Sequence, residues 1–132
     1  MEAALQPVPA EEWWGRRRLR YNVGLIVAGL LAFVCYVGVV FWGISIGAIP
    51  DPGAITLFTT IVQGMGYLFM MAVANVCYLL GPFSERAIKP TDVDRYRRIT
   101  FGLGFWFSVL LPFSIPALLA SLCVVRPAWW HE

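Results

Sequence analysis

Few side chains in this 132-residue sequence have the chemistry of an active site. The only histidine, His131, is the penultimate residue, and Asp92 and Asp94 form a carboxylate pair. Two carboxylates without the glycines, lysine or further acids of a phosphate site fit a charged helix start better than a metal centre. The three cysteines lie far apart inside apolar runs, at Cys35, Cys77 and Cys123. The sequence therefore predicts no catalytic residue, no metal site and no cofactor, and we expect that the protein is not an enzyme.

Charged residues are absent from three long stretches of the chain. The composition is 59% hydrophobic and 14% charged, and residues 21–50, 52–84 and 99–125 carry no charged side chain. A transmembrane helix needs roughly 20 apolar residues, because lipid cannot pair with the backbone N–H and C=O groups. The sequence predicts an all-α membrane protein, a single three-helix bundle with spans at 21–47, 54–80 and 99–125.

The basic residues predict the orientation of these spans. Nine of the ten lysines and arginines precede the first span or lie between the second and third, and only Arg126 lies on the other side. Short loops rich in Lys and Arg stay in the cytoplasm. We therefore expect residues 1–20 to be a cytoplasmic or interfacial arm, 81–98 a cytoplasmic loop and 126–132 an outer tail. The expected location is the plasma membrane, most simply a bacterial inner membrane.

The arginines next to the spans are expected to bind lipid rather than nucleic acid. Cytoplasmic leaflets carry anionic headgroups, which attract juxtamembrane cations at about 1 kcal/mol each. Trp13 and Trp14 fit the same interfacial layer, where indole rings have one polar and one apolar edge. The residues expected at headgroups are Arg16, Arg17, Arg18, Arg20, Arg97 and Arg98.

Two helix ends can be predicted from local signals. Gly81 followed by Pro82 is typical of a helix C-terminus, so the second helix is expected to end there. Thr91 is the expected N-cap of the third helix, with Asp94 three residues later as a variant of the capping box.

Small residues recur on the first expected helix. Gly24, Ala28 and Ala32 are spaced by four, and Gly43 and Gly47 form a second pair. Small residues at this spacing let helix backbones approach closely in lipid. They predict either a contact between copies of the chain or packing against its own other helices.

The second expected helix carries a polar stripe. At about 100° per residue its members fall within an arc of roughly 120°. Membrane amides face protein or a wet cavity, so the stripe predicts either hydrogen bonds between helices or a path for a substrate. Its polar members are Thr56, Thr60, Gln63, Tyr67, Asn75 and Tyr78.

The third expected helix contains Pro112 and Pro116, four residues apart. Each proline removes an N–H and leaves a carbonyl unpaired one turn earlier, so a kink is expected. A kink serves gating in some proteins, but neighbouring helices often compensate for it, and a structural kink is the simpler interpretation.

These features predict a small non-enzymatic membrane protein. We expect an accessory or assembly subunit of a larger membrane complex, or a homo-oligomer, whose partners are the bilayer and other membrane subunits or copies of itself. The alternative is a pore or carrier built from several copies and lined by the polar stripe.

Overall fold

The structure, a computed structural model, describes residues 6–49 and 56–125, which are helical apart from short turns and the segment before the first helix. Three helical rods are long and apolar enough to cross a membrane. The first rod is α1, the second is α2 followed by α3, and the third is α4 and α5 joined by a 3-10 turn. Their bounds are α1 Ala10–Ser45, α2 Leu57–Tyr78, α3 Leu80–Ile88, α4 Val93–Leu110, η2 Leu111–Phe113 and α5 Ser114–Val125.

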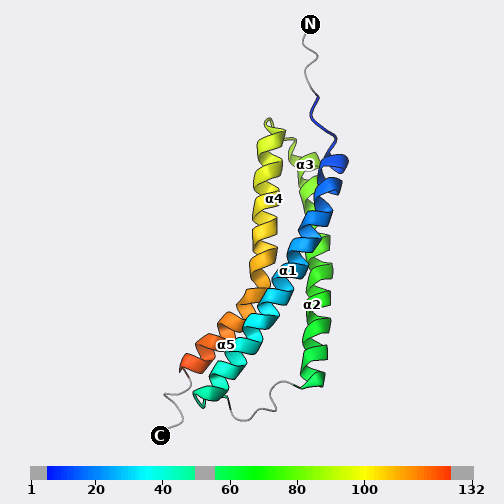
Figure 1. Cartoon of the computed structure of the whole chain (residues 1–132). Helices are drawn as coiled ribbons and strands as arrows, with labels where there is room; N and C mark the ends of the chain where they lie inside the picture. Colours follow the sequence, from blue (N-terminus) through cyan, green and yellow to red (C-terminus); the bar gives the residue numbers. More distant parts are fainter. Residues whose placement is uncertain (1–5, 50–55, 126–132) are drawn as a thin grey trace.

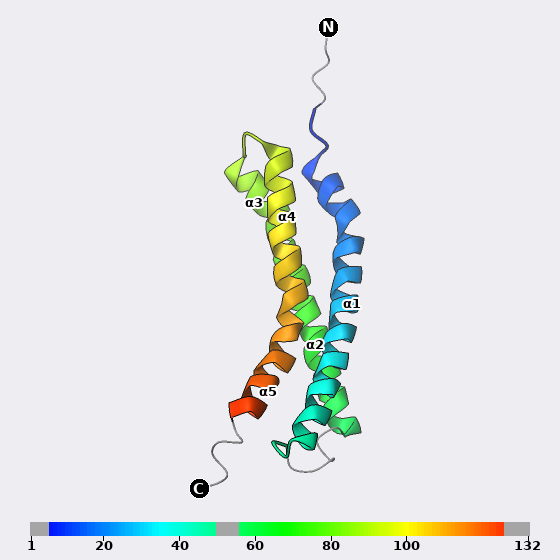
Figure 2. The ribbon, with the colours of Figure 1, turned by 60° about the vertical axis from the view of Figure 1, so that its left-hand side comes forward.

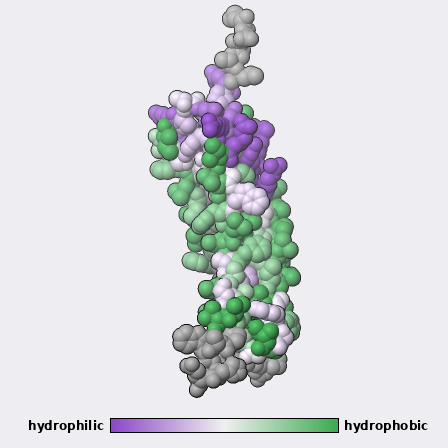
Figure 3. Space-filling view, turned by 90° about the vertical axis from the view of Figure 1, so that its left-hand side faces the viewer, coloured by the Kyte–Doolittle hydropathy of each residue, from purple (hydrophilic) through white to green (hydrophobic). Residues whose placement is uncertain are grey.

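Helix α1 lies between the other two rods in the view of Figure 1, and it runs alongside both of them in Figure 2. It packs against α4, η2 and α5 along its length, and it also contacts α2 and α3. Leu25 and Val40 are fully buried on it, and Ala28 and Ala32 are almost so. Polar residues gather at the end of the bundle where α1 begins, whereas the body of the bundle is apolar (Figure 3). The core that positions the candidate site lies next to that polar end.

Helix α1 begins at Ala10, well before the expected span of residues 21–47. Glu11 and Glu12 lie in its first turn, where carboxylates stabilise the positive end of the helix dipole, and Glu12 pairs with Arg16 one turn later. The arm that carries the arginines is therefore largely helical.

Gly47 lies beyond the end of α1 rather than on a packing face, which corrects its expected role. The N–H of Gly47 donates to the carbonyl of Ile44, and the N–H of Ala48 donates to that of Gly43. This pair of bonds is a Schellman motif, and Gly47 has the left-handed φ of 73° that the motif requires.

The expected cytoplasmic loop 81–98 consists mainly of helix, because Gly81 and Pro82 do not end the second rod. A single turn at Leu79 separates α2 from α3, and Pro82 is the third residue of α3. Backbone N–H groups in the first turn of a helix have no partner within the helix, so a proline costs little there. The chain reverses instead at Lys89, which has a left-handed φ of 48°.

Helices α4 and α2 both begin after a residue whose side chain caps the helix. The residue before α4 is Asp92, not Thr91, and its carboxylate accepts a hydrogen bond from the N–H of Arg95 at 3.1 Å. Helix α2 starts after Thr56, which forms a capping box with Thr59. The expected start at Ala54 lies outside the described residues.

The third rod bends at η2, between α4 and α5 (Figure 1). Pro112 lies within this 3-10 turn, and Pro116 is the third residue of α5, again in a first turn. Both prolines are buried. The bend directs α5 along the far half of α1, which it contacts.

Candidate functional site

A buried aromatic core lies next to the polar end of the bundle. Trp14, Tyr21 and Leu25 from α1 pack with Tyr78, the last residue of α2. The ring centroids of Tyr21 and Tyr78 are 4.8 Å apart, and those of Trp14 and Tyr78 are 5.6 Å apart. Phe101 of α4 packs against the same rings. Three rods therefore meet at one layer of aromatic side chains.

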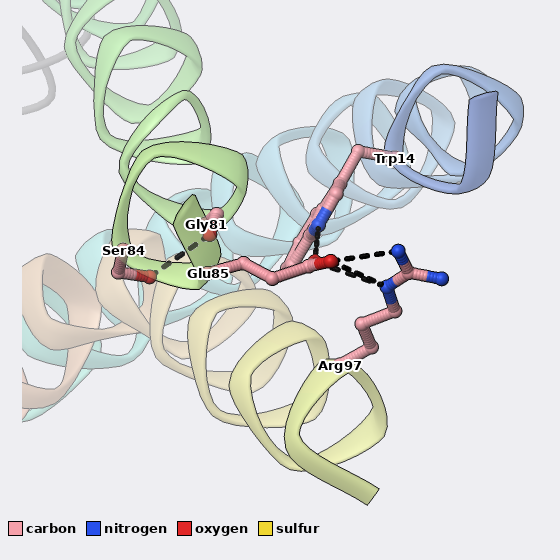
Figure 4. Close-up of polar contacts among 5 residues, drawn as sticks. All are labelled: Trp14, Gly81, Ser84, Glu85 and Arg97. Atoms are coloured by element: carbon pink, nitrogen blue, oxygen red, sulfur yellow. Dashed lines mark hydrogen bonds and ion pairs between the residues drawn. The ribbon is translucent and has the colours of Figure 1, made fainter. Parts of the chain in front are cut away.

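An ion pair between Glu85 and Arg97 is buried beside this core (Figure 4). The Nη2 atom of Arg97 donates to Oε1 of Glu85 at 2.7 Å, and Nε donates at 3.0 Å to Oε2. Trp14 Nε1 donates to Oε2 at 2.9 Å. The two charged side chains are only 3% and 9% exposed. One carboxylate on α3 thus connects α1 and α4.

The burial of Arg97 corrects the prediction that it reaches lipid headgroups. Arg98, the next residue along α4, is exposed. Arg97 instead faces Glu85, because the chain reverses between α3 and α4 and brings the two helices together. Trp14, expected at the interface, is only 4% exposed. The Nη1 atom of Arg97 has no hydrogen-bond partner among the described residues. Its guanidinium carbon lies 5.6 Å from the centroid of the Trp13 ring, a distance that favours a cation–π contact.

The other expected headgroup arginines remain at the surface. Arg17 is half-buried, with its guanidinium 3.7 Å from the centroid of the Trp13 ring. The exposed members are Arg16, Arg18, Arg20 and Arg98.

The charge of Glu85 is stabilised by its neighbours. Glu85 lies after the span expected over residues 54–80. The Arg97 guanidinium that donates to Glu85 holds the pKa of the carboxyl below its ordinary value of 4.5. Burial acts in the opposite direction, and the bond from Trp14 adds to the lowering. A carboxylate held ionised by three N–H donors suits the joining of helices rather than proton transfer near neutral pH.

The polar stripe of α2 lies on the side that meets α1. The hydroxyl of Tyr67 donates to the carbonyl of Leu25, and Nδ2 of Asn75 donates to Oδ1 of Asn22 at 2.8 Å. At the end of the helix the hydroxyl of Tyr78 donates to the carbonyl of Trp14. These three bonds hold α2 against α1.

Within the described ranges, the remaining stripe residues form no hydrogen bond to α1. Thr60 donates to the carbonyl of Thr56 within its own helix. Gln63 is half-buried, and its side chain forms no hydrogen bond within residues 6–49 and 56–125. Pro112 frees the carbonyl of Ser108, one turn earlier, as a candidate partner for Gln63, but the two form no hydrogen bond in the described part of the chain.

The sequence analysis did not identify two residues that form hydrogen bonds between the rods, Asn22 and Ser108. Asn22 is the only amide in the first charge-free stretch, a signal that could have paired it with Asn75. Tyr21 makes a second link, a hydrogen bond of 2.7 Å between its hydroxyl and that of Ser108 on α4. No periodic pattern in the sequence marks Ser108.

The small residues of α1 pack inside the chain. The ring of Phe105 lies over Gly24, at 2.5 Å from where a Cβ would be. Ala28 and Ala32 are 3% and 5% exposed, and Gly43 lies against the sulfur of Cys123. The structure thus places this face in contact with the third rod, not at an open surface.

A cavity of about 220 Å³ lies between α1, the junction of α2 with α3, and the second half of α4. Its walls include Tyr21, Tyr78, Phe101 and Ser108. The hydroxyls of both tyrosines are already hydrogen-bonded within the protein. The cavity is therefore chiefly an apolar space.

In the part of the chain that the structure describes, no three His, Cys, Asp or Glu side chains lie close enough to hold a metal ion. Comparisons of the chain with protein-family models, with curated proteins and with solved structures gave no match.

Proposed function

We propose that this chain is a three-span membrane protein that serves as a non-enzymatic accessory or assembly subunit, either of a larger membrane complex or of a homo-oligomer. Its arginine-rich end lies in the cytoplasm, and the membrane is the plasma membrane of a bacterium. The orientation is supported by the charge distribution, since nine of the ten basic residues lie on one side of the three charge-free stretches.

The observation that carries the proposal is how little of α2 is buried by the rest of the chain. None of the most apolar 18-residue stretch of the second rod is buried, against 22% for each of the other two rods. Within α2, only Tyr78 is buried. The helix is held by a few hydrogen bonds along one edge, and most of its surface is left for lipid or another protein.

Gln63 favours protein over lipid as the neighbour of this surface. An amide left unpaired in hydrocarbon costs about 4 to 8 kcal/mol on alkane transfer scales. Gly66 lies on the next turn of the same side, and nothing lies within 4 Å of where its Cβ would be. A second helix that approached at Gly66 would bring a polar partner within reach of Gln63, as helices in membranes commonly do.

The pore alternative has weaker support, because the stripe that would line the pore meets α1. Tyr67 and Asn75 are both hydrogen-bonded to that helix. A conducting path along the stripe would require these bonds to break.

The test is the mass of the protein after extraction in a mild detergent. We expect an assembly, and we expect Gln63→Leu to dissociate it while Met65→Leu, at a residue that is 66% exposed, leaves it intact. A wild-type monomer without a co-purifying protein would overturn the proposal. Solute flux through vesicles that contain only the purified chain would favour the pore instead.

A further inference from the structure

A second cavity, of about 400 Å³, lies between the start of α1 and the junction of α2 with α3. Gly15 and Arg18 line it from α1, and Leu79, Phe83 and Arg86 line it from the other side. Its floor includes Trp14 and Tyr78 of the aromatic core. We call this cavity the basic groove.

The basic groove combines positive charge with an apolar wall. Arg18 and Arg86 are both exposed, and Arg18 forms no ion pair within the described ranges. Arg86 pairs with Glu11, another residue of the groove, whose side chain is 79% exposed. An exposed ion pair of this kind is weak, so an anion can displace Glu11 from Arg86.

The apolar wall distinguishes a lipid from a free anion. Leu79 is 51% exposed and Phe83 is 69% exposed, next to the apolar body of α2. A phosphate between the two guanidiniums would leave an acyl chain free to follow this wall into the bilayer. Basic pockets between transmembrane helices are known to bind anionic headgroups in this way.

We propose that the basic groove binds one anionic phospholipid, with its headgroup phosphate between Arg18 and Arg86 and an acyl chain along Leu79 and Phe83. The proposal requires that the helices cross a membrane with their arginine-rich end in one headgroup layer, as proposed above. It does not depend on the direction of insertion or on any partner subunit.

The experiment measures lipid binding to the purified, delipidated chain by native mass spectrometry, with phosphatidylglycerol and phosphatidylcholine as probes. At about 1 kcal/mol per cation, Arg18→Ala with Arg86→Ala should weaken phosphatidylglycerol binding about 30-fold. The control, Lys89→Ala with Arg95→Ala, removes the same charge from exposed positions outside the groove and should retain the bound lipid.

A second variant tests the groove without changing its charge. Gly15→Leu places a side chain in the groove, and nothing lies within 4 Å of the new Cβ, so the fold should tolerate it. Bound phosphatidylglycerol should be lost in this variant too, even if the arginine variant fails to fold. Retention of the lipid by Gly15→Leu would overturn the proposal, as would equal losses from the groove pair and the control pair of substitutions.

Two further outcomes concern the identity of the ligand. Phosphatidylcholine that binds as tightly as phosphatidylglycerol would show that negative charge is not recognised. Inorganic phosphate that protects the protein against thermal unfolding as well as phosphatidylglycerol does would show that the groove takes a free anion. Either result would overturn the lipid assignment, while the mass of the assembly would still test the proposed function separately.

Discussion

At the scale of single residues, the buried pair of Glu85 and Arg97 is the most demanding feature of the structure. Two ions removed from water lose several kcal/mol of hydration each, so such a pair is stable only when its hydrogen bonds are well formed. Here the carboxylate receives bonds from Arg97 and from Trp14. We infer that the pair specifies how α1, α3 and α4 meet rather than adding much net stability.

Arg97→Met should lower the free energy of unfolding by about 3 to 5 kcal/mol, because it leaves the Glu85 carboxylate buried without a cation. The double change of Glu85→Gln with Arg97→Met removes both charges and should recover most of that loss. Reversible unfolding in mixed detergent micelles measures both. Arg98→Met, at an exposed position, is the control and should change stability by less than about 0.5 kcal/mol. A double variant as unstable as the single one would contradict this account.

The sequence predicts residue types better than residue environments here. Arg97 and Arg98 are adjacent and chemically identical, and both were expected at headgroups, yet only Arg98 is exposed. The difference depends on the reversal at Lys89, which brings α3 against the Arg97 side of α4. That reversal depends on the backbone of a single non-glycine residue, which no spacing rule predicts.

At the scale of elements, Gly81 has a different role from the helix end that the sequence predicted. It does not end a helix but lies under the Trp14 ring, so that α3 can approach α1 closely. The dipeptide of Gly81 and Pro82 is compatible with a helix end or with a helix start, because proline is tolerated in a first turn. Only the contact with Trp14 distinguishes the two.

Gly81→Ala should destabilise the protein by about 1 to 3 kcal/mol through overpacking, because its Cβ would lie 2.6 Å from Cη2 of Trp14. The ring cannot easily move, since it is 4% exposed and bonded to Glu85. Gly102→Ala is the matched control on α4, where nothing lies within 4 Å of the new Cβ, and it should be neutral or stabilising. Thermal unfolding in detergent compares the two. Equal shifts in melting temperature would show that the contact with Trp14 does not matter.

At the scale of the whole molecule, the charge-free stretches predict three long apolar helices, and this much is confirmed. Their arrangement is not predictable in the same way. Small residues at spacing four could face another copy or the same chain, and the contact of Gly43 with Cys123 of α5 depends on the bend at Pro112, which determines the course of α5. Pairing between Asn22 and Asn75 likewise depends on the register of two rods.

The orientation of the whole molecule gives the last prediction. Basic residues lie at one end of the rods, and the energetic cost of moving them across the bilayer should keep that end in the cytoplasm. In a background without native cysteines, a membrane-impermeant thiol reagent applied to intact cells should label Trp130→Cys and not Ala87→Cys. Ala87 lies on the exposed side of α3 and should react once the cells are permeabilised, which controls for accessibility. Labelling of Ala87→Cys alone in intact cells would reverse the orientation, and labelling of both positions would indicate that the chain inserts in two directions.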